Sequence, residues 1–302
     1  MKPILKWVGG KTQILKEVFQ KFPSTIENYY EICLGGGSVL FELLQKIKAG
    51  DIELRGKIYA YDVNKTLIYV YKNIQSHCDE LYSTIQTLIK EYNSCKNIGT
   101  INRTPETKEE AILQKENYYY WTRKRFNMLE DQTTIEASAM LIFLNKTCFR
   151  GLYRCGPNGF NVPYGHYKNP EIINESHLKQ VEEIIKNVEF ICEDFETSMD
   201  SPTDNDFVYI DPPYAPETIN SFVGYTEKGF TELDHKKLFQ KCYDLSKRNV
   251  KWLMSNANVP IIDTCFPDST YDKTIILCKR AINAKNPGKK TKEVLIREPI
   301  IS

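Results

Sequence analysis

The apolar residues of the N-terminal third follow a strand pattern and then a helix pattern, twice in succession. Residues 29–34 (YYEICL) form a short β-prone run, and residues 38–48 (SVLFELLQKIK) carry apolar side chains at helical spacing. The glycines 35–37 separate these two stretches, as a tight turn requires. A second strand is predicted over residues 57–64 (KIYAYDVN), and a helix begins directly after it. The pattern predicts two strand–helix units.

The middle of the chain departs from this rhythm. Helices are predicted over residues 79–93, 108–129 and 135–145. A loop rich in Gly, Pro and Asn follows from Arg150 to Pro170. We therefore expect residues 75–180 to form an inserted, mostly helical domain.

Strand patterns resume after the insert at four places, namely residues 188–195, 206–211, 250–257 and 273–278. A helix is predicted between them over residues 232–247. Alternating strands and helices are typical of an α/β fold whose mostly parallel sheet is covered on both faces. The main domain is expected to comprise residues 1–74 and 181–302.

Composition is that of a globular protein, because 41% hydrophobic and 26% charged residues allow a full core and a polar surface. The longest apolar runs, such as residues 139–144, fall short of the roughly 18 residues of a membrane span, and no signal-type stretch follows Met1. We expect a protein without membrane segments that acts inside a cell. Nine cysteines without a Cys-x-x-Cys motif and four scattered histidines predict reduced thiols and no metal site.

The net charge of +1 hides an uneven distribution of charge. Residues 115–168 hold eight Lys or Arg against four acidic residues, and residues 279–297 hold seven against Glu293 alone. Two basic zones on a nearly neutral chain indicate a local surface for a polyanion. Solvated lysine-rich faces would give the same distribution, so charge by itself leaves both interpretations open.

The glycine segments exclude two common ligand classes. A phosphate-binding P-loop ending in Gly10-Lys-Thr would need a glycine at Leu5, and the dinucleotide fingerprint after Gly35 would need a glycine at Leu40. The remaining pattern is a glycine turn followed by Asp62 at the end of the next strand, 25 residues after Gly37. That carboxylate suits a ribose diol, which predicts a ligand with an adenosine-like half and no pyrophosphate. An ordinary strand–helix turn is the alternative.

The segment DFVYIDPPY (206–214) places an acid where chemistry is expected. Ligands of parallel sheets bind beyond the carboxyl ends of the strands, which is the position of Asp211. Pro212 and Pro213 lack N–H groups and stop the strand in a stiff turn that presents carbonyl oxygens. A carboxylate and a carbonyl match the two N–H donors of an exocyclic amine, and Tyr214 offers a ring for stacking on a base. A capped turn without function is the alternative.

Taken together, these motifs resemble the D12 class of DNA adenine-N6 methyltransferases, the group that includes the Dam enzymes. The resemblance runs from end to end, through PILKWVGGK (3–11), YYEICLGGGSV (29–39), YAYDVN (59–64), ICEDF (191–195), DPPY (211–214) and the basic segment 279–296. The order of cofactor loop, insert and DPPY is that of the α-type amino-methylases. The resemblance implies an α/β fold with the Rossmann-like sheet of S-adenosylmethionine-dependent methyltransferases. Residues 1–74 and 181–302 would be the catalytic domain and residues 75–180 an inserted target-recognition domain.

The resemblance also implies S-adenosyl-L-methionine as the methyl donor. Asp62 would bind the ribose, and Asp194 and Phe195 would border the adenine of the cofactor. The family usually has a Pro-Phe pair where this chain has Ile32 and Cys33. The cofactor-binding residues implied are Trp7, Lys11, Glu31, Gly35, Gly37, Ser38, Asp62, Asp194, Phe195 and Asp211.

Residues 143–170 resemble the target-recognition loop of the same family. The DNA-binding residues implied are Lys6, Phe149, Arg150, Leu152, Arg154, Asn161 and Pro163. Phe149 would wedge into the base stack, and Arg154 would contact a guanine edge through O6 and N7. Relatives that methylate GATC carry Asn in place of Arg150, so the target is GATC or a similar four-base palindrome such as CATG. Contacts of these arginines to phosphate alone are the other interpretation.

The implied reaction is methyl transfer to adenine N6 in double-stranded DNA after the base is flipped out of the duplex. The catalytic set is Asp211, Pro212, Pro213 and Tyr214, and no metal is expected. Two alternatives stay open: a catalytically silent methylase-fold protein that only binds DNA, and an amino-methylase that acts on cytosine N4 or RNA. The enzyme is expected in the cytoplasm, or in a host cell if it is viral. The sequence leaves open a restriction–modification role beside a separately acting cognate endonuclease.

Overall fold

One sheet of seven strands forms the centre of the molecule, in the order β10, β11, β9, β8, β2, β4, β7. The computed structural model describes residues 1–215, 229–279 and 290–299. Five adjacent strands are parallel: β2 (Tyr29–Ile32), β4 (Ile58–Asp62), β7 (Val188–Cys192), β8 (Phe207–Ile210) and β9 (Lys251–Ala257). Two further strands join antiparallel at one side: β10 (Tyr271–Lys279) and β11 (Lys290–Pro299). The mostly parallel α/β sheet predicted from the sequence is confirmed.

The carboxyl ends of the central strands are level with one another. Ile32 of β2 pairs with Ile210 of β8 and with Tyr61 of β4, and the Asp211 N–H donates to the Ile32 carbonyl at 3.1 Å. Every residue of β2 and β8 is buried, because helices cover both faces of the sheet; all of them except Glu31 are apolar or aromatic. The segments that follow these three strands therefore share one edge of the sheet.

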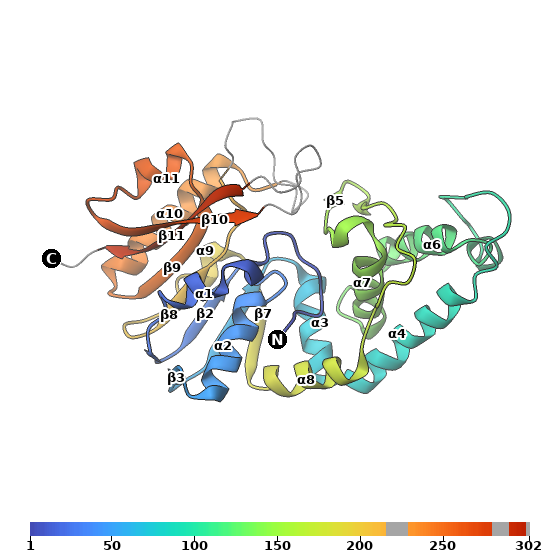
Figure 1. Cartoon of the computed structure of the whole chain (residues 1–302), viewed down its shortest axis with the longest axis horizontal. Coiled ribbons are helices and arrows are strands. Elements are labelled where there is room, and N and C mark those ends of the chain that lie inside the picture. The colour runs from blue at the N-terminus through green and yellow to red at the C-terminus, as the bar shows by residue number, and fades with distance from the viewer. Residues whose placement is uncertain (216–228, 280–289, 300–302) are drawn as a thin grey trace.

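Helices cover the two faces with separate apolar cores (Figure 1). On one face lie η1 (Lys11–Gln13), α1 (Leu15–Phe19), α2 (Ser38–Ala49), α3 (Lys65–Ser76) and α8 (Glu175–Ile185). The other face is covered by α9 (Phe195–Ser198), α10 (Glu232–Lys247) and α11 (Pro260–Cys265). A short parallel pair, β1 (Thr25–Ile26) and β3 (Glu53–Leu54), stands outside the main sheet. None of the helices in the described ranges is long and apolar enough to cross a membrane.

The insert lies to one side of the sheet and is mostly helical (Figure 1). Its elements are α4 (Cys78–Asn93), α5 (Lys108–Ala111), α6 (Lys115–Met128), α7 (Ile135–Thr147), η2 (Phe149–Gly151), β5 (Cys155–Gly156) and β6 (Gly159–Phe160). α7 is buried on nearly all sides because it packs against α3, α4 and α6 together. The apolar core of the insert is continuous with that of α2 and α3.

Three details differ from the prediction. The helix expected over residues 108–129 is two helices, because Gln114 adopts an extended backbone at φ −142° and ψ 146° between α5 and α6. The predicted loop from Arg150 to Pro170 contains η2 and the hairpin of β5 and β6. The elements not predicted outside that loop are η1, α1, β1, β3, α8, α9, α11 and β11.

Candidate active site at the carboxyl edge of the sheet

The acid predicted at the end of β8 forms an ion pair with a lysine from the N-terminal segment. Lys11 Nζ lies 2.6 Å from Asp211 Oδ1 and 2.7 Å from Oδ2, and it also donates to the Gly9 carbonyl. The Lys11 side chain is 3% exposed and that of Asp211 21%. A charge buried to this degree needs such partners, because its water shell is lost.

Tyr214 completes the cluster. Its ring lies under the same ammonium group, with Lys11 Nζ 4.8 Å from the ring centroid. Its hydroxyl donates to Glu293 Oε2 at 2.8 Å, which fixes the tilt of the ring. Glu293 belongs to β11 and was not among the predicted site residues. Its only sequence signal was that it is the sole acid in a basic zone.

Burial and neighbouring charges set the protonation of the acids. Burial raises the pKa of Asp211 to about 6; Lys11 acts against this rise and the Glu293 carboxylate adds to it. Burial also raises the pKa of Glu31 to about 8, opposed by a 2.7 Å hydrogen bond from the Tyr29 hydroxyl. The carboxylate of Asp211 raises it further. The edge is therefore an acid cluster in which Lys11 is the compensating cation.

Asn256 holds the turn that follows the two prolines, a role the sequence did not reveal. Its side-chain oxygen accepts the Ala215 N–H at 2.9 Å and the Ala257 N–H at 2.8 Å. Asn256 is fully buried, and its Nδ2 has no partner within the described ranges.

The glycine loop after β2 lies beside this cluster. Gly35 adopts a φ of +52°, and its N–H donates to Asp62 Oδ2 at 2.9 Å. A Cβ at Gly35 would lie 2.8 Å from Trp7 Cδ1, so only glycine allows the indole to lie against the loop. The Lys11 N–H donates to Ser38 Oγ at 2.9 Å, which joins the N-terminal segment to the start of α2.

The other predicted cofactor residues fall on the same edge. Asp62 Oδ1 accepts the Asn64 N–H at 2.9 Å, and the Asp62 carbonyl accepts the Glu193 N–H at 3.2 Å. Asp194 follows directly and caps α9 through the Thr197 N–H at 2.9 Å. The fold thus brings all ten predicted cofactor residues to the ends of β2, β4, β7 and β8 or to the segment that packs on them.

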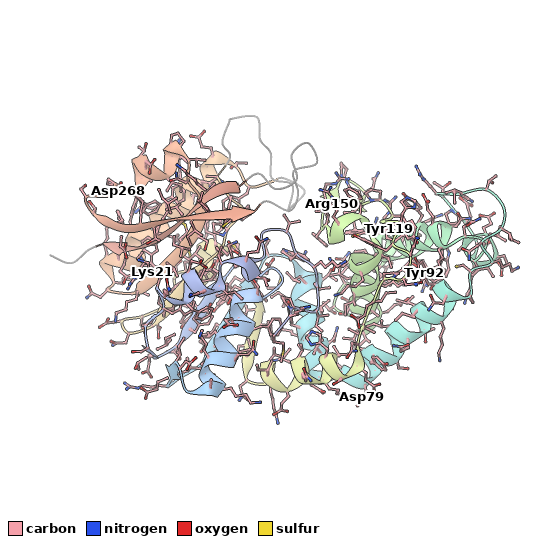
Figure 2. The ribbon with its side chains drawn as sticks, in the orientation of Figure 1. Lys21, Asp79, Tyr92, Tyr119, Arg150 and Asp268 are labelled. Carbon is pink, nitrogen blue, oxygen red and sulfur yellow. The ribbon has the colours of Figure 1, made fainter. Side chains whose placement is uncertain are left out.

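The predicted DNA-binding residues gather where the insert faces the sheet, and Figure 2 shows Arg150 at that end of the insert. Phe149 is 44% exposed, and the Arg150 guanidinium lies 5.2 Å from its ring centroid. Arg154 is exposed, and its Nε donates to Asn161 Oδ1 at 2.6 Å. Exposed Pro163 accepts the Phe149 N–H through its carbonyl at 2.8 Å.

Asn145 ties this end of the insert to the N-terminal segment, and it too was missed. Its Oδ1 accepts the Lys6 N–H at 2.8 Å, and its Nδ2 donates to the carbonyls of Lys6 at 2.7 Å and Gly151 at 3.2 Å. Lys6 itself is exposed, and its ammonium lies 4.8 Å from the Tyr167 ring centroid. Most of the C-terminal basic segment predicted over residues 279–296 lies outside the described residues.

Comparison with known proteins assigns the chain to a family. The chain matches the model of the D12 class N6 adenine-specific DNA methyltransferase family over residues 7–283. It is 37% identical to the Type II methyltransferase M.MjaIII of Methanocaldococcus jannaschii over 299 residues, which cover 96% of each chain. It is 28% identical to the Type II methyltransferase M1.LlaDCHI of Lactococcus lactis subsp. cremoris, over 98% of this chain and 95% of that one.

A third relative, the DNA adenine methylase of Escherichia coli strain K12, is 27% identical over 98% of this chain and 94% of its own length. The chain belongs to the D12 class N6 adenine-specific DNA methyltransferase family. It is therefore an adenine-specific DNA methyltransferase, as its motifs predicted. The family assignment disfavours the alternatives of cytosine N4, RNA or a silent binding protein.

Proposed function

We propose that the enzyme transfers a methyl group from S-adenosyl-L-methionine to adenine N6 within a short palindromic site of double-stranded DNA, GATC or a similar site such as CATG. The observation that carries this proposal is the cluster at one sheet edge: the Asp211 carboxylate, the Tyr214 ring and the adjoining loop of Gly35 and Asp62. Asp211 and Tyr214 suit a flat amine, and Gly35 and Asp62 suit a nucleoside.

The residues on this edge fit the proposed cofactor. Each Asp62 oxygen accepts one N–H in the fold and keeps a further lone pair for a ribose hydroxyl. Lys11 is surrounded by three acceptors, so it would favour a cofactor carboxylate through its charge. Bound S-adenosylmethionine would supply a methyl group already activated on a sulfonium. The residues to hold it are Trp7, Lys11, Glu31, Gly35, Gly37, Ser38, Asp62, Asp194, Phe195 and Asp211.

The enzyme's own contribution is to present the amine. Asp211 gives its oxygens to Lys11 and keeps lone pairs for one N6 hydrogen, while the Pro212 carbonyl accepts the other. These acceptors favour the partly cationic, tetrahedral nitrogen that develops during transfer. Tyr214, held in place by Glu293, stacks on the adenine for about 1–3 kcal/mol, and Pro213 stiffens the turn. Such contacts offset the few kcal/mol that flipping a base costs.

The insert supplies site recognition in this proposal. Arg154 contacts a guanine edge from the rigid position that Asn161 gives it, and Phe149 enters the base stack. Arg150, Leu152 and Pro163 line the same surface. Lys6 contacts the phosphate backbone from the N-terminal segment. Residues 75–180 are thus proposed as the target-recognition domain, and residues 1–74 and 181–302 as the catalytic domain.

The relatives named Type II methyltransferases support a role in restriction and modification for this chain also. The partner would be a separately acting endonuclease that cuts the same site. Since the substrate is duplex DNA, we place the enzyme in the cytoplasm, or in the host cell if it is viral.

Substitution of Asp211 tests the proposed chemistry. Asp211→Asn and Asp211→Ala are expected to lower transfer of labelled methyl groups to duplex DNA by at least about a hundredfold, the effect of losing one preorganised polar group. The asparagine variant keeps the side-chain volume, whereas alanine leaves the Lys11 charge unpaired, so circular dichroism checks the fold of each. Sequencing of modified bases in the product identifies the site. Wild-type turnover by folded Asp211→Asn would remove Asp211 from the mechanism.

A further inference from the structure

Tyr153 lies in the segment of predicted DNA-binding residues 149–163, called the DNA-reading segment below, but it is only partly exposed. Its neighbours Leu152 and Arg154 are the predicted base contacts, and Arg154 is exposed. The Tyr153 ring instead stacks on Trp7, with ring centroids 5.1 Å apart and an interplanar angle of 22°. One residue of the insert thus packs on a residue of the cofactor edge.

Trp7 connects Tyr153 to a series of contacts that runs through the glycine loop. Trp7 lies against Gly35, whose N–H donates to Asp62. Asp62 in turn accepts the Asn64 N–H at 2.9 Å. Every other member of this series comes from the proposed catalytic domain. Tyr153 is the insert's contribution to it.

A second tether runs parallel to the stack. The buried amide of Asn145 bonds to both Lys6 and Gly151, the residues next to Trp7 and two before Tyr153. Gly151 has a φ of +65°, and a Cβ there would lie 2.5 Å from Lys6 Cβ. The DNA-reading segment and the N-terminal segment are therefore in contact at two places, Asn145 and the Trp7–Tyr153 stack.

We propose that Tyr153 is a positioning residue that couples the DNA-reading segment to the cofactor cradle. Contacts of Phe149 and Arg154 to DNA hold the segment in place, and Tyr153 then holds Trp7 against the Gly35 loop. A cofactor that binds to this ordered cradle loses less conformational freedom, so each ligand strengthens the binding of the other. This inference rests on the proposed function, since it takes S-adenosylmethionine and duplex DNA as the two ligands.

The test measures binding without turnover. Calorimetric titration of sinefungin, an unreactive analogue of the cofactor, is carried out with and without a saturating concentration of duplex DNA that contains the recognition site. We expect duplex DNA to tighten sinefungin binding to the wild type by at least about fivefold, the lower range of coupling between sites. Tyr153→Ala is expected to lower this factor to near one. Tyr153→Phe, which keeps the ring, is expected to retain most of it.

Two controls separate coupling from damage to the fold. Tyr82→Ala removes a half-buried tyrosine of α4 that takes no part in this series of contacts. It is expected to leave the tightening of sinefungin binding by DNA unchanged. If Tyr153→Ala melts at a lower temperature than Tyr82→Ala, Tyr153→Leu restores most of the volume without the planar ring and is used in its place.

The outcomes are distinct. Wild-type coupling that survives in the Ala or Leu variant overturns the role of Tyr153 and leaves the proposed function intact. Absence of coupling in a wild type that binds both ligands also overturns it. A wild type that binds neither sinefungin nor duplex DNA overturns the proposed function itself. Loss of coupling in both Tyr153→Ala and Tyr153→Phe would assign the effect to the Tyr153 hydroxyl, which accepts from the Cys155 thiol at 3.4 Å, and overturn the role of the aromatic ring.

Discussion

At the scale of single residues, the site depends on how two opposing effects balance at Asp211. Burial disfavours its charge, and Lys11 at 2.6 Å favours it. The resulting pKa of about 6 lies above the ordinary value of 3.8, so the native state holds the proton more tightly than the unfolded chain. Asp211 therefore contributes stability that is present below about pH 4 and lost as the pH rises through 6.

The same balance predicts the pH dependence of activity. The proposed clamp requires ionised Asp211, so kcat/KM should rise with pH through about 6 and reach about a tenth of its plateau at pH 5. Glu293→Gln removes the negative charge that raises the pKa of Asp211, and it keeps an acceptor for the Tyr214 hydroxyl. We expect this variant to show the same rise at a lower pH in steady-state kinetics.

Glu189→Gln serves as the control for this measurement. Glu189 pairs with Lys57 on the exposed surface at the other end of the strands. Its neutralisation should leave the pH profile where it is. If the rise of kcat/KM with pH occurs at the same pH in Glu293→Gln as in the wild type, the ionisation of Asp211 does not cause that rise.

Sequence reasoning found the residues that end strands and missed the contacts that join them to distant parts of the chain. Asp211 and Asp62 were predicted because their strands are local patterns. The ion pair of Lys11 with Asp211 joins positions 200 apart, and no periodicity specifies such a contact. The supporting roles of Glu293 and Asn256 likewise exist only once β9 and β11 have joined the sheet.

At the scale of elements, the β5–β6 hairpin positions the proposed reader of the target site. Arg154 Nε and Nη2 donate to the side chain and carbonyl of Asn161 across the hairpin, at 2.6 and 3.3 Å. A guanidinium fixed in this way loses less entropy when it contacts a base. The rigidity of the hairpin is therefore part of the proposed specificity.

Two substitutions in the hairpin test this role. Arg154→Ala is expected to reduce discrimination between the true site and a site with one changed base pair by about 1–3 kcal/mol. Asn161→Ala should lower it in the same direction by less, because the arginine remains. The measurement is kcat/KM on duplexes that differ at one base pair. Full discrimination by Arg154→Ala would leave Arg154 as a phosphate contact at most.

The elements that escaped prediction had signals of their own. α8 carries Leu178, Val181 and Ile185 at helical spacing after the capping residue Asn174. The predicted boundary of the insert at residue 180 falls within this helix, between Leu178 and Val181. β11 has a basic, strongly polar sequence, and its buried Val294, Leu295 and Ile296 gain their partners only from β9 and β10.

At the scale of the whole molecule, the distribution of charge matters more than the net charge. The chain has a net charge of only +1, so its long-range attraction to DNA is weak. Local contacts of basic side chains with phosphates must therefore supply the affinity for DNA. Exposed Lys6, Arg150 and Arg154 stand around the same face between insert and sheet. Lys57, also exposed, precedes β4 at the opposite edge of the sheet.

This placement predicts which lysine changes the salt dependence of binding. Lys6→Ala removes one proposed phosphate contact, so the slope of log K against log salt should fall in magnitude by about 1, and affinity should weaken equally for all duplex sequences. Lys57→Ala removes the same charge at the far edge and should leave the slope unchanged. Fluorescence anisotropy from about 50 to 200 mM salt measures both. Equal slopes for Lys6→Ala and the wild type would place the DNA backbone away from the N-terminal segment and contradict the proposed interface.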